Sequence, residues 1–229
     1  MITLTNIKKV YRTDEIETVA LDNINIDIKK NEFVSIMGPS GCGKSTLLNI
    51  IGLLDNPSEG LMTIGDTDVT KMNEKQLAKF RNEKLGFVFQ SFHLINTLNV
   101  IDNVELPLLY RGVKAKERRE RAEEILTKVG LVHRMRHFPS QLSGGQCQRV
   151  AIARAIVGNP EIILADEPTG NLDPKLSMEI MSLLVQMKEY GKTVVVVTHE
   201  EELAKMFRQR IVRLKGGRLV DDESGGDGQ

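Results

Sequence analysis

The chain has 229 residues, of which 41% are hydrophobic and 27% charged, and its 31 basic and 31 acidic side chains give a formal net charge of zero. This composition is typical of a globular protein with a large core, and it predicts no overall attraction to nucleic acid or to an anionic membrane surface. The apolar runs are far shorter than the ~20 residues of a membrane-spanning helix, and the first residues do not resemble a secretory signal. We therefore expect a cytosolic protein that does not itself span a membrane.

The first thirty residues alternate loosely between apolar and polar side chains. Apolar positions recur from Ile2 to Val10 and again from Val19 to Ile28, on either side of a polar stretch at residues 13–15. Such alternation is typical of strands. We expect a small antiparallel sheet at the N-terminus, joined by a polar turn.

A glycine-rich octapeptide at residues 38–45 follows the strand-like run of residues 32–37 and precedes a helical pattern that stops near Gly52. It reads Gly-Pro-Ser-Gly-Cys-Gly-Lys-Ser, the G-x-x-x-x-G-K-S pattern of a phosphate-binding loop. The glycines let main-chain N–H groups close around phosphate oxygens, Lys44 reaches the β- and γ-phosphates, and the Ser45 hydroxyl can ligate Mg²⁺. The sequence therefore predicts a nucleoside triphosphate site. Its expected contacts are Gly38, Ser40, Gly41, Cys42, Gly43, Lys44, Ser45 and Thr46.

The segment after this loop has three further recognisable elements. Residues 61–69 indicate a hairpin around Gly65, and residues 85–89 indicate a buried strand. Residues 113–129 form an amphipathic helical pattern with charges of both signs interleaved. We interpret this helix as having a solvated charged face, in preference to a nucleic-acid patch.

A second anion site is predicted at residues 142–146, which read Leu-Ser-Gly-Gly-Gln before a predicted helix over residues 147–157. Ser143, Gly144 and Gly145 offer a hydroxyl and free N–H groups at a helix start, as the first loop does.

Two carboxylates follow the apolar strand at residues 162–165. At the end of a parallel strand, Asp166 can hold Mg²⁺, and Glu167 can position or deprotonate the water that attacks the γ-phosphate. A helix over residues 176–190 then leads to another buried strand, residues 193–197. Alternating strands and helices predict an α/β fold with a parallel sheet whose ligands lie at the carboxyl ends of the strands.

Taken together, these motifs resemble the ATP-binding subunit of an ATP-binding-cassette (ABC) transporter, over nearly the whole chain. The resemblance implies ATP and Mg²⁺ as ligands, with a P-loop NTPase (RecA-like) core, a small N-terminal antiparallel β-subdomain and an inserted α-helical subdomain. The motifs that carry it are residues 38–45, Gln90, residues 142–146, residues 162–167, the Gly-Asn-Leu-Asp of residues 170–173, and Thr198-His199.

The resemblance also implies one ABC ATPase domain over residues 1–220. Its core would span about 1–90 and 157–220, and its helical subdomain about 91–156. Residues 221–229 are acidic and glycine-rich, and we expect a disordered tail there.

The resemblance further implies a head-to-tail homodimer, in which ATP on one subunit is covered by Ser143, Gly144, Gly145 and Gln146 of the other. Tyr11 would stack on adenine, although without the resemblance the sequence fits a packing residue equally well. Gln90 would contact Mg²⁺, and His199 would touch the γ-phosphate, although by itself it resembles a surface histidine before an acidic run. Asp173 would contact the opposite subunit.

A finer similarity is to the lipoprotein-releasing and the macrolide- and peptide-exporting transporters, carried by the wording of residues 81–90, 92–94 and 103–108. The macrolide exporters carry their membrane part on the same chain. This chain stops soon after Val220, so we expect separate permease subunits, docked near residues 91–107, and membrane contact only through them. Cys147 departs from the Gln or Glu common in the family; with Cys42 it makes too few cysteines for a disulfide framework.

We therefore expect an ATPase in which Lys44, Glu167 and His199 act in hydrolysis and Ser45, Gln90 and Asp166 hold the metal. It would work at the inner face of the cell membrane. The main alternative is a cytosolic ABC ATPase that acts in cell division or cofactor assembly without transport. A nucleic-acid-handling ATPase is disfavoured because the chain has neither a repeated cassette nor sustained heptads.

Overall fold

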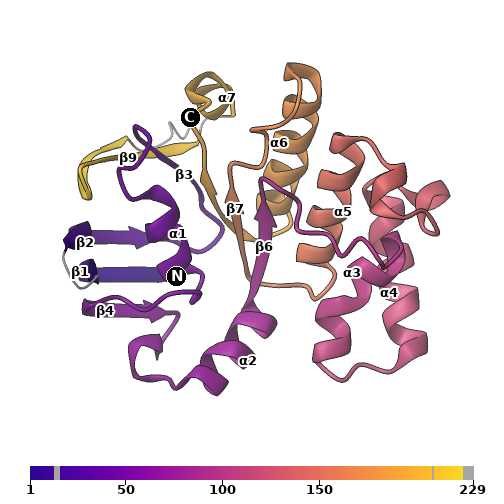
Figure 1. The fold of residues 1–229 in the computed structure, drawn as a ribbon, viewed down its shortest axis with the longest axis horizontal. Coiled ribbons are helices and arrows are strands. Elements are labelled where there is room, and N and C mark those ends of the chain that lie inside the picture. The colour runs from indigo at the N-terminus through magenta and orange to yellow at the C-terminus, as the bar shows by residue number, and fades with distance from the viewer. Residues whose placement is uncertain (13–15, 208, 224–229) are drawn as a thin grey trace.

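The computed structural model describes residues 1–12, 16–207 and 209–223. Its centre is a six-stranded sheet in the order β10-β9-β3-β8-β7-β6 (Figure 1). Neighbouring strands are parallel except at one edge of the sheet, where β10 runs antiparallel to β9. The strand bounds are β3 (Phe33–Met37), β6 (Leu85–Phe89), β7 (Ile162–Asp166), β8 (Thr193–Val197), β9 (Arg210–Lys215) and β10 (Arg218–Glu223).

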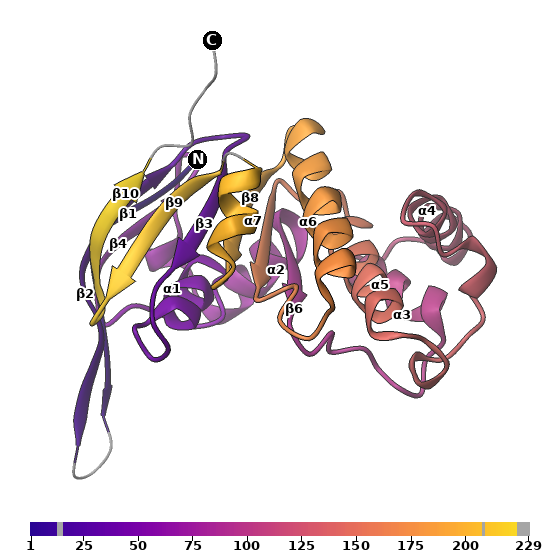
Figure 2. The ribbon, with the colours of Figure 1, turned by 90° about the horizontal axis from the view of Figure 1, so that it is seen from above.

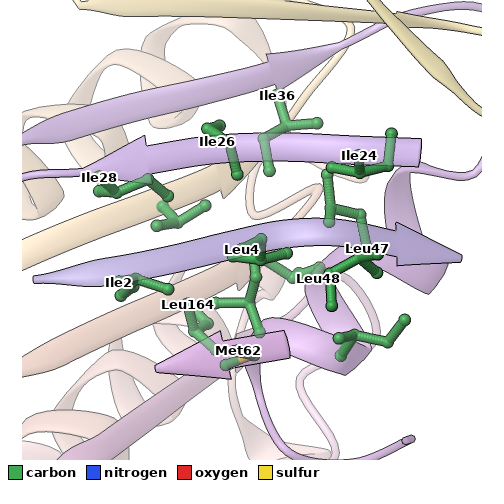
Figure 3. Packing of buried hydrophobic residues seen from close by; sticks show 14 of the residues in the cluster. Ile2, Leu4, Ile24, Ile26, Ile28, Ile36, Leu47, Leu48, Met62 and Leu164 are labelled. Atoms are coloured by element: carbon green, nitrogen blue, oxygen red, sulfur yellow. The ribbon is translucent and has the colours of Figure 1, made fainter. Parts of the chain in front are cut away.

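A second, antiparallel sheet in the order β2-β1-β4-β5 faces the first. Its strands are β1 (Ile2–Arg12), β2 (Glu17–Ile28), β4 (Glu59–Ile64) and β5 (Thr67–Asp68). Helix α1 (Lys44–Ile51) lies between the two sheets, and its buried leucines contact isoleucines of both (Figure 3). This packing fixes the start of α1, and with it the phosphate loop, against both sheets.

The opposite face of the central sheet is covered by α5 (Gly144–Ile156) and α6 (Pro174–Glu189). The β-branched residues of β7 and β8 are buried on both faces, as parallel strands in a layered fold require. The apolar runs at residues 162–165 and 193–197 were read correctly as such strands.

A group of helices lies at one end of the molecule, away from the antiparallel sheet (Figures 1 and 2). Helices α3 (Val100–Tyr110) and α4 (Ala115–Lys128) pack with α5 around a separate apolar cluster. Two further helices precede strands of the central sheet in the chain: α2 (Glu74–Lys84) comes before β6, and α7 (Glu201–Met206) comes before β9. In the part of the chain that the structure describes, no helix combines the length and apolarity that a bilayer crossing needs.

The structure confirms the α/β class, the P-loop NTPase core, the N-terminal antiparallel sheet and the hairpin at residues 61–69. The division into a core of about 1–90 and 157–220 and a helical subdomain of about 91–156 stays a prediction. Helix α5 begins at Gly144, three residues earlier than predicted, because Ser143 caps it. The predicted turn at residues 13–15 lies outside the described residues.

The expected disordered tail is wrong for residues 221–223, which form the end of β10. Their acidic side chains neutralise arginines of β9: Arg213 pairs with Asp221 at 2.8 Å and with Glu223 at 2.8 Å, and Arg210 pairs with Asp222 at 2.6 Å. Composition indicated unpaired charge, whereas the fold supplies opposite charges on the neighbouring strand. Residues 224–229 lie outside the described part.

Candidate functional site

The predicted catalytic segments meet at one edge of the central sheet. Because β3, β8, β7 and β6 are parallel and in register, their carboxyl ends lie side by side. The phosphate loop follows β3, His199 follows β8, Asp166 ends β7 and Gln90 follows β6. The sheet therefore gathers residues that are up to 161 positions apart in sequence.

Glycine is required in the phosphate loop for two separate reasons. Gly38 and Gly43 have φ angles of 149° and 105°, which other residues rarely adopt. A Cβ at Gly38 would lie 2.2 Å from the Leu214 carbonyl oxygen, and one at Gly43 would lie 2.6 Å from that of Ala20. The loop is thus wedged against both sheets.

Helix α1 begins at Lys44 with no side chain capping its N-terminus. Its first N–H groups are therefore directed at the loop without an intrahelical partner, which suits an anion. The Lys44 ammonium donates to the Gly38 and Pro39 carbonyls at 2.9 and 3.0 Å, which holds it over the loop. Main-chain donors and the lysine together form a phosphate cradle.

Ser45 and Asp166 meet across the sheet edge, where the serine hydroxyl donates to the carboxylate at 3.4 Å. Burial raises the pKa of Asp166, and repulsion from Glu167 raises it further, while the Ser45 hydrogen bond and the Lys44 charge oppose the shift. Within the described ranges, no group of three or more His, Cys, Asp or Glu forms a metal cluster. One hydroxyl and one carboxylate beside a phosphate cradle fit Mg²⁺, which takes few protein ligands and completes its shell with phosphates and water.

Glu167 has a left-handed φ of 43°, a conformation that costs on the order of 1–3 kcal/mol and is common at active sites. Its N–H donates to the Val197 carbonyl at 2.9 Å, which ties β7 to β8. The carboxylate lies 3.8 Å from Nδ1 of His199, and the side chains are 29% and 63% exposed. Both therefore reach solvent at the same place.

Gln90 approaches this segment closely. A Cβ on Gly170 would lie 2.6 Å from its Nε2 and 3.4 Å from Oε2 of Glu167. The structure therefore brings Gln90 together with the phosphate loop, Asp166, Glu167 and His199. Their assigned roles in hydrolysis and metal binding stay predictions.

Tyr11 lies near the start of α1 and is 43% exposed. Its hydroxyl donates to Asp55 at 2.9 Å, and Lys9 Nζ lies 5.0 Å from the ring centroid. Burial and the Asp55 hydrogen bond raise the pKa of Tyr11, while a hydrogen bond with Thr46 opposes the shift. The ring is thus anchored beside α1 with part of its surface free.

The second anion site lies apart from the phosphate loop of the same chain. Helices α5 and α1 are on opposite sides of β6 and β7 (Figures 1 and 2). Ser143 and Gln146 form a capping box at the start of α5, with Ser143 Oγ accepting from the Gln146 N–H at 3.3 Å. Asp173 caps α6 nearby and accepts from the N–H groups of Lys175 and Leu176. A ligand shared by the two loops would have to lie between two chains.

Two contacts that sequence reasoning missed hold the Glu167 segment. Thr169, 2% exposed, donates to Glu200 Oε1 at 2.6 Å. Gln148 of α5, fully buried, donates to the Pro168 carbonyl at 2.7 Å. The Thr169 bond joins residues 31 apart in sequence and the Gln148 bond joins residues 20 apart. No local sequence pattern signals either bond.

The two cysteines are free and buried. Burial raises the pKa of the Cys147 thiol. Its Sγ donates weakly to the Pro139 carbonyl at 3.7 Å. The residue that departs from the family pattern therefore packs inward, away from the sheet edge.

A family model described as ABC transporter matches residues 21–170. The chain is 53% identical over 228 residues to an uncharacterized ABC transporter ATP-binding protein, MJ0796 of Methanocaldococcus jannaschii, covering 97% of each. A solved dimeric structure of that cassette in a post-hydrolysis state, bound to ADP and Pi, superposes with a TM-score of 0.92 and 49% identity over 100% of both chains. The macrolide export ATP-binding/permease protein MacB of Chlorobium luteolum is 48% identical over 97% of this chain but only 33% of its own length.

Proposed function

Because this chain belongs to the ABC transporter family, as an ATP-binding subunit with ATPase activity, we propose that it powers a separate membrane permease of the export or mechanotransmission type. The observation that carries the hydrolytic part of the proposal is the convergence of the phosphate loop, Asp166, Glu167 and His199 at one sheet edge. Relatives of similar length bear the name ATP-binding protein, which supports a permease on another chain. The cytoplasmic face of the cell membrane is the place where such a subunit would work.

In the proposed hydrolysis, Lys44 and the N–H groups at the start of α1 hold the β- and γ-phosphates. Ser45 and Asp166, with Gln90 beside them, would hold Mg²⁺, which neutralises charge on the phosphates. The Glu167 carboxylate takes a proton from the attacking water as its oxygen bonds to the γ-phosphorus, and the bond to the ADP oxygen breaks. His199, 3.8 Å from that carboxylate, contacts the γ-phosphate.

We further propose a head-to-tail homodimer that encloses two ATP molecules. The separation of Ser143 from the phosphate loop of its own chain supports this, because a nucleotide on that loop lies away from the start of α5. The start of α5 could therefore contact only the nucleotide of a second chain. The cassette of 49% identity is described as dimeric with ADP and Pi. Ser143, Gly144, Gly145 and Gln146 of each chain would cover the nucleotide of the other, and Asp173 would contact the partner.

A groove of about 900 Å³ between α2, β6, α3 and α5 is the proposed docking surface for the permease. Its apolar lining includes Leu54, Phe87, Leu106, Pro107 and Tyr110, the last 80% exposed. It overlaps the predicted docking segment, residues 91–107, at its two ends and extends beyond it to α2.

The charge of the groove indicates the chemistry of its occupant. Four basic residues line it, namely Lys79, Arg81, Arg111 and Arg154. The single acidic residue of the lining, Glu83, lies 3.9 Å from Lys79 and so opposes that charge. The three arginines donate to main-chain carbonyls, including those of Leu53, Gly158 and Phe92, so their charges are not cancelled by these contacts. We propose that an amphipathic permease segment with acidic and apolar side chains occupies the groove, because it would supply both the missing negative charge and the apolar cover.

The test is copurification of tagged Glu167→Gln protein with ATP from solubilised membranes of the native host. A permease with a large extracytoplasmic domain should be recovered, and Lys79→Glu, which reverses an exposed groove charge, should lose it. Lys75→Glu, on the same helix but outside the groove, should retain it. Recovery of soluble partners alone would support the non-transport alternative, and equal recovery by both lysine variants would exclude this docking surface.

A further inference from the structure

Gln148 is a fully buried amide of α5, a helix whose other buried residues are small or apolar. Its Nε2 donates to the Pro168 carbonyl at 2.7 Å, while its Oε1 is buried without a hydrogen-bond partner within the described residues. The buried, unpaired Oε1 is unfavourable, and the amide offsets that cost only through its bond to the Pro168 carbonyl. The bond to Pro168 is therefore the polar contact through which this side chain acts.

Pro168 immediately follows Glu167, the residue with the left-handed φ of 43°. Proline has no N–H, so its carbonyl is the only main-chain group by which Pro168 can be held. On the other side, the Glu167 N–H is bonded to Val197 at 2.9 Å. The unfavourable backbone conformation of Glu167 is thus fixed from β8 before it and from α5 after it.

The helix that holds Pro168 is also the one that begins at Ser143. Gln148 lies five residues after Ser143, about one and a half turns along α5. A shift of the start of α5 is therefore carried to the Pro168 carbonyl through a single side chain.

We infer that Gln148 is a positioning residue for hydrolysis, through which α5 sets the orientation of the Glu167 carboxylate in the same chain. The inference rests on the proposed role of Glu167. It links the predicted cover of one nucleotide, at Ser143, to the chemistry of the other nucleotide of the dimer.

The test compares steady-state ATP hydrolysis by Gln148→Met and by Ile152→Val. Methionine keeps the volume and removes the donor, whereas Ile152→Val removes one buried methyl group from the same helix and leaves the Gln148 donor in place. Gln148→Met should lower kcat roughly tenfold, as expected for a lost interaction of ~1.4 kcal/mol, with KM changed less than about twofold. Ile152→Val should keep the parental kcat.

A second variant and a binding readout separate positioning from folding. Gln148→Asn keeps the amide but is one methylene shorter, so it cannot reach the Pro168 carbonyl in the same way and should show the same loss of kcat. It replaces Gln148→Met in the test if that variant does not fold. In the Glu167→Gln background, Gln148→Met should still form the ATP-dependent dimer. The inference is overturned by a parental kcat in a folded Gln148 variant, by a loss that appears in KM, or by an equal loss in Ile152→Val. Parental hydrolysis by Glu167→Gln alone would instead refute the proposed role of Glu167, on which the inference rests.

Discussion

Substitution by alanine should cost more folding stability at Gly43 than at Gly41, although both glycines belong to the phosphate loop. Both glycines have left-handed φ angles, 105° and 75°, so either substitution introduces backbone strain of about 1 kcal/mol. A Cβ at Gly41 meets nothing within 4 Å. A Cβ at Gly43 lies 2.6 Å from the Ala20 carbonyl oxygen and 2.9 Å from Leu21 Cδ2, so β2 must move, and overpacking of this kind costs about 1–3 kcal/mol more.

The free energy of unfolding should therefore fall by about 1 kcal/mol for Gly41→Ala and about 3 kcal/mol for Gly43→Ala. In a chain of this size each kcal/mol lowers Tm by about 2–4 °C, so the two variants should melt about 4–8 °C apart. Differential scanning calorimetry of the nucleotide-free proteins measures this difference directly. Equal melting temperatures would refute the argument that β2 presses on the loop at Gly43.

Two further predictions follow from the carboxylates of the site. Burial raises the pKa of Asp166, so the folded protein holds the carboxyl proton more tightly than the unfolded chain does. The stability that this proton contributes is therefore lost as the pH rises from the pKa of the unfolded chain through the higher pKa of the folded protein. Asp166→Asn should therefore raise the Tm of the nucleotide-free protein at pH 7.5 and abolish the further rise given by ATP with Mg²⁺; an unchanged Tm without nucleotide contradicts the desolvation argument. Glu200→Gln weakens the charge-assisted bond to Thr169 and should lower kcat by about threefold to tenfold, whereas Glu202→Gln, an exposed neighbour, should leave kcat at the parental value; equal rates for the two variants would show that the Thr169 contact does not position the site.

The meeting of these residues at one sheet edge was predictable because each part is local in sequence. The phosphate loop is one octapeptide, and Asp166 follows an unbroken apolar strand, so strand, loop and helix signals agreed at each position. The order of parallel strands then places these segments together by a general rule. What the strand signals did not provide was the left-handed φ of Glu167, which depends on the bonds that hold it.

The bonds around Glu167 were not predictable because they join distant segments through single side chains. Glu200 belongs to the acidic run that follows His199, yet its side chain does not cap α7 and binds Thr169 instead. Gln148 lies in a predicted helix that also carries Arg149 and Arg154, so nothing in the sequence marked it as the buried polar residue. For the acidic residues 221–223 the reason is similar, since arginines of β9 neutralise them only after the chain has folded.

In the proposed dimer, ATP joins two copies of this chain, between Ser143 of one and the phosphate loop of the other. The most direct measurement is the mass of Glu167→Gln protein in solution, by light scattering, with and without ATP and Mg²⁺. We expect a change from the 25.6 kDa monomer to a species of twice that mass on adding ATP. We also expect that Ser143→Arg in the same background binds ATP but stays monomeric. A Glu167→Gln protein that binds ATP and remains a monomer, or a Ser143→Arg variant that dimerises equally well, would contradict it.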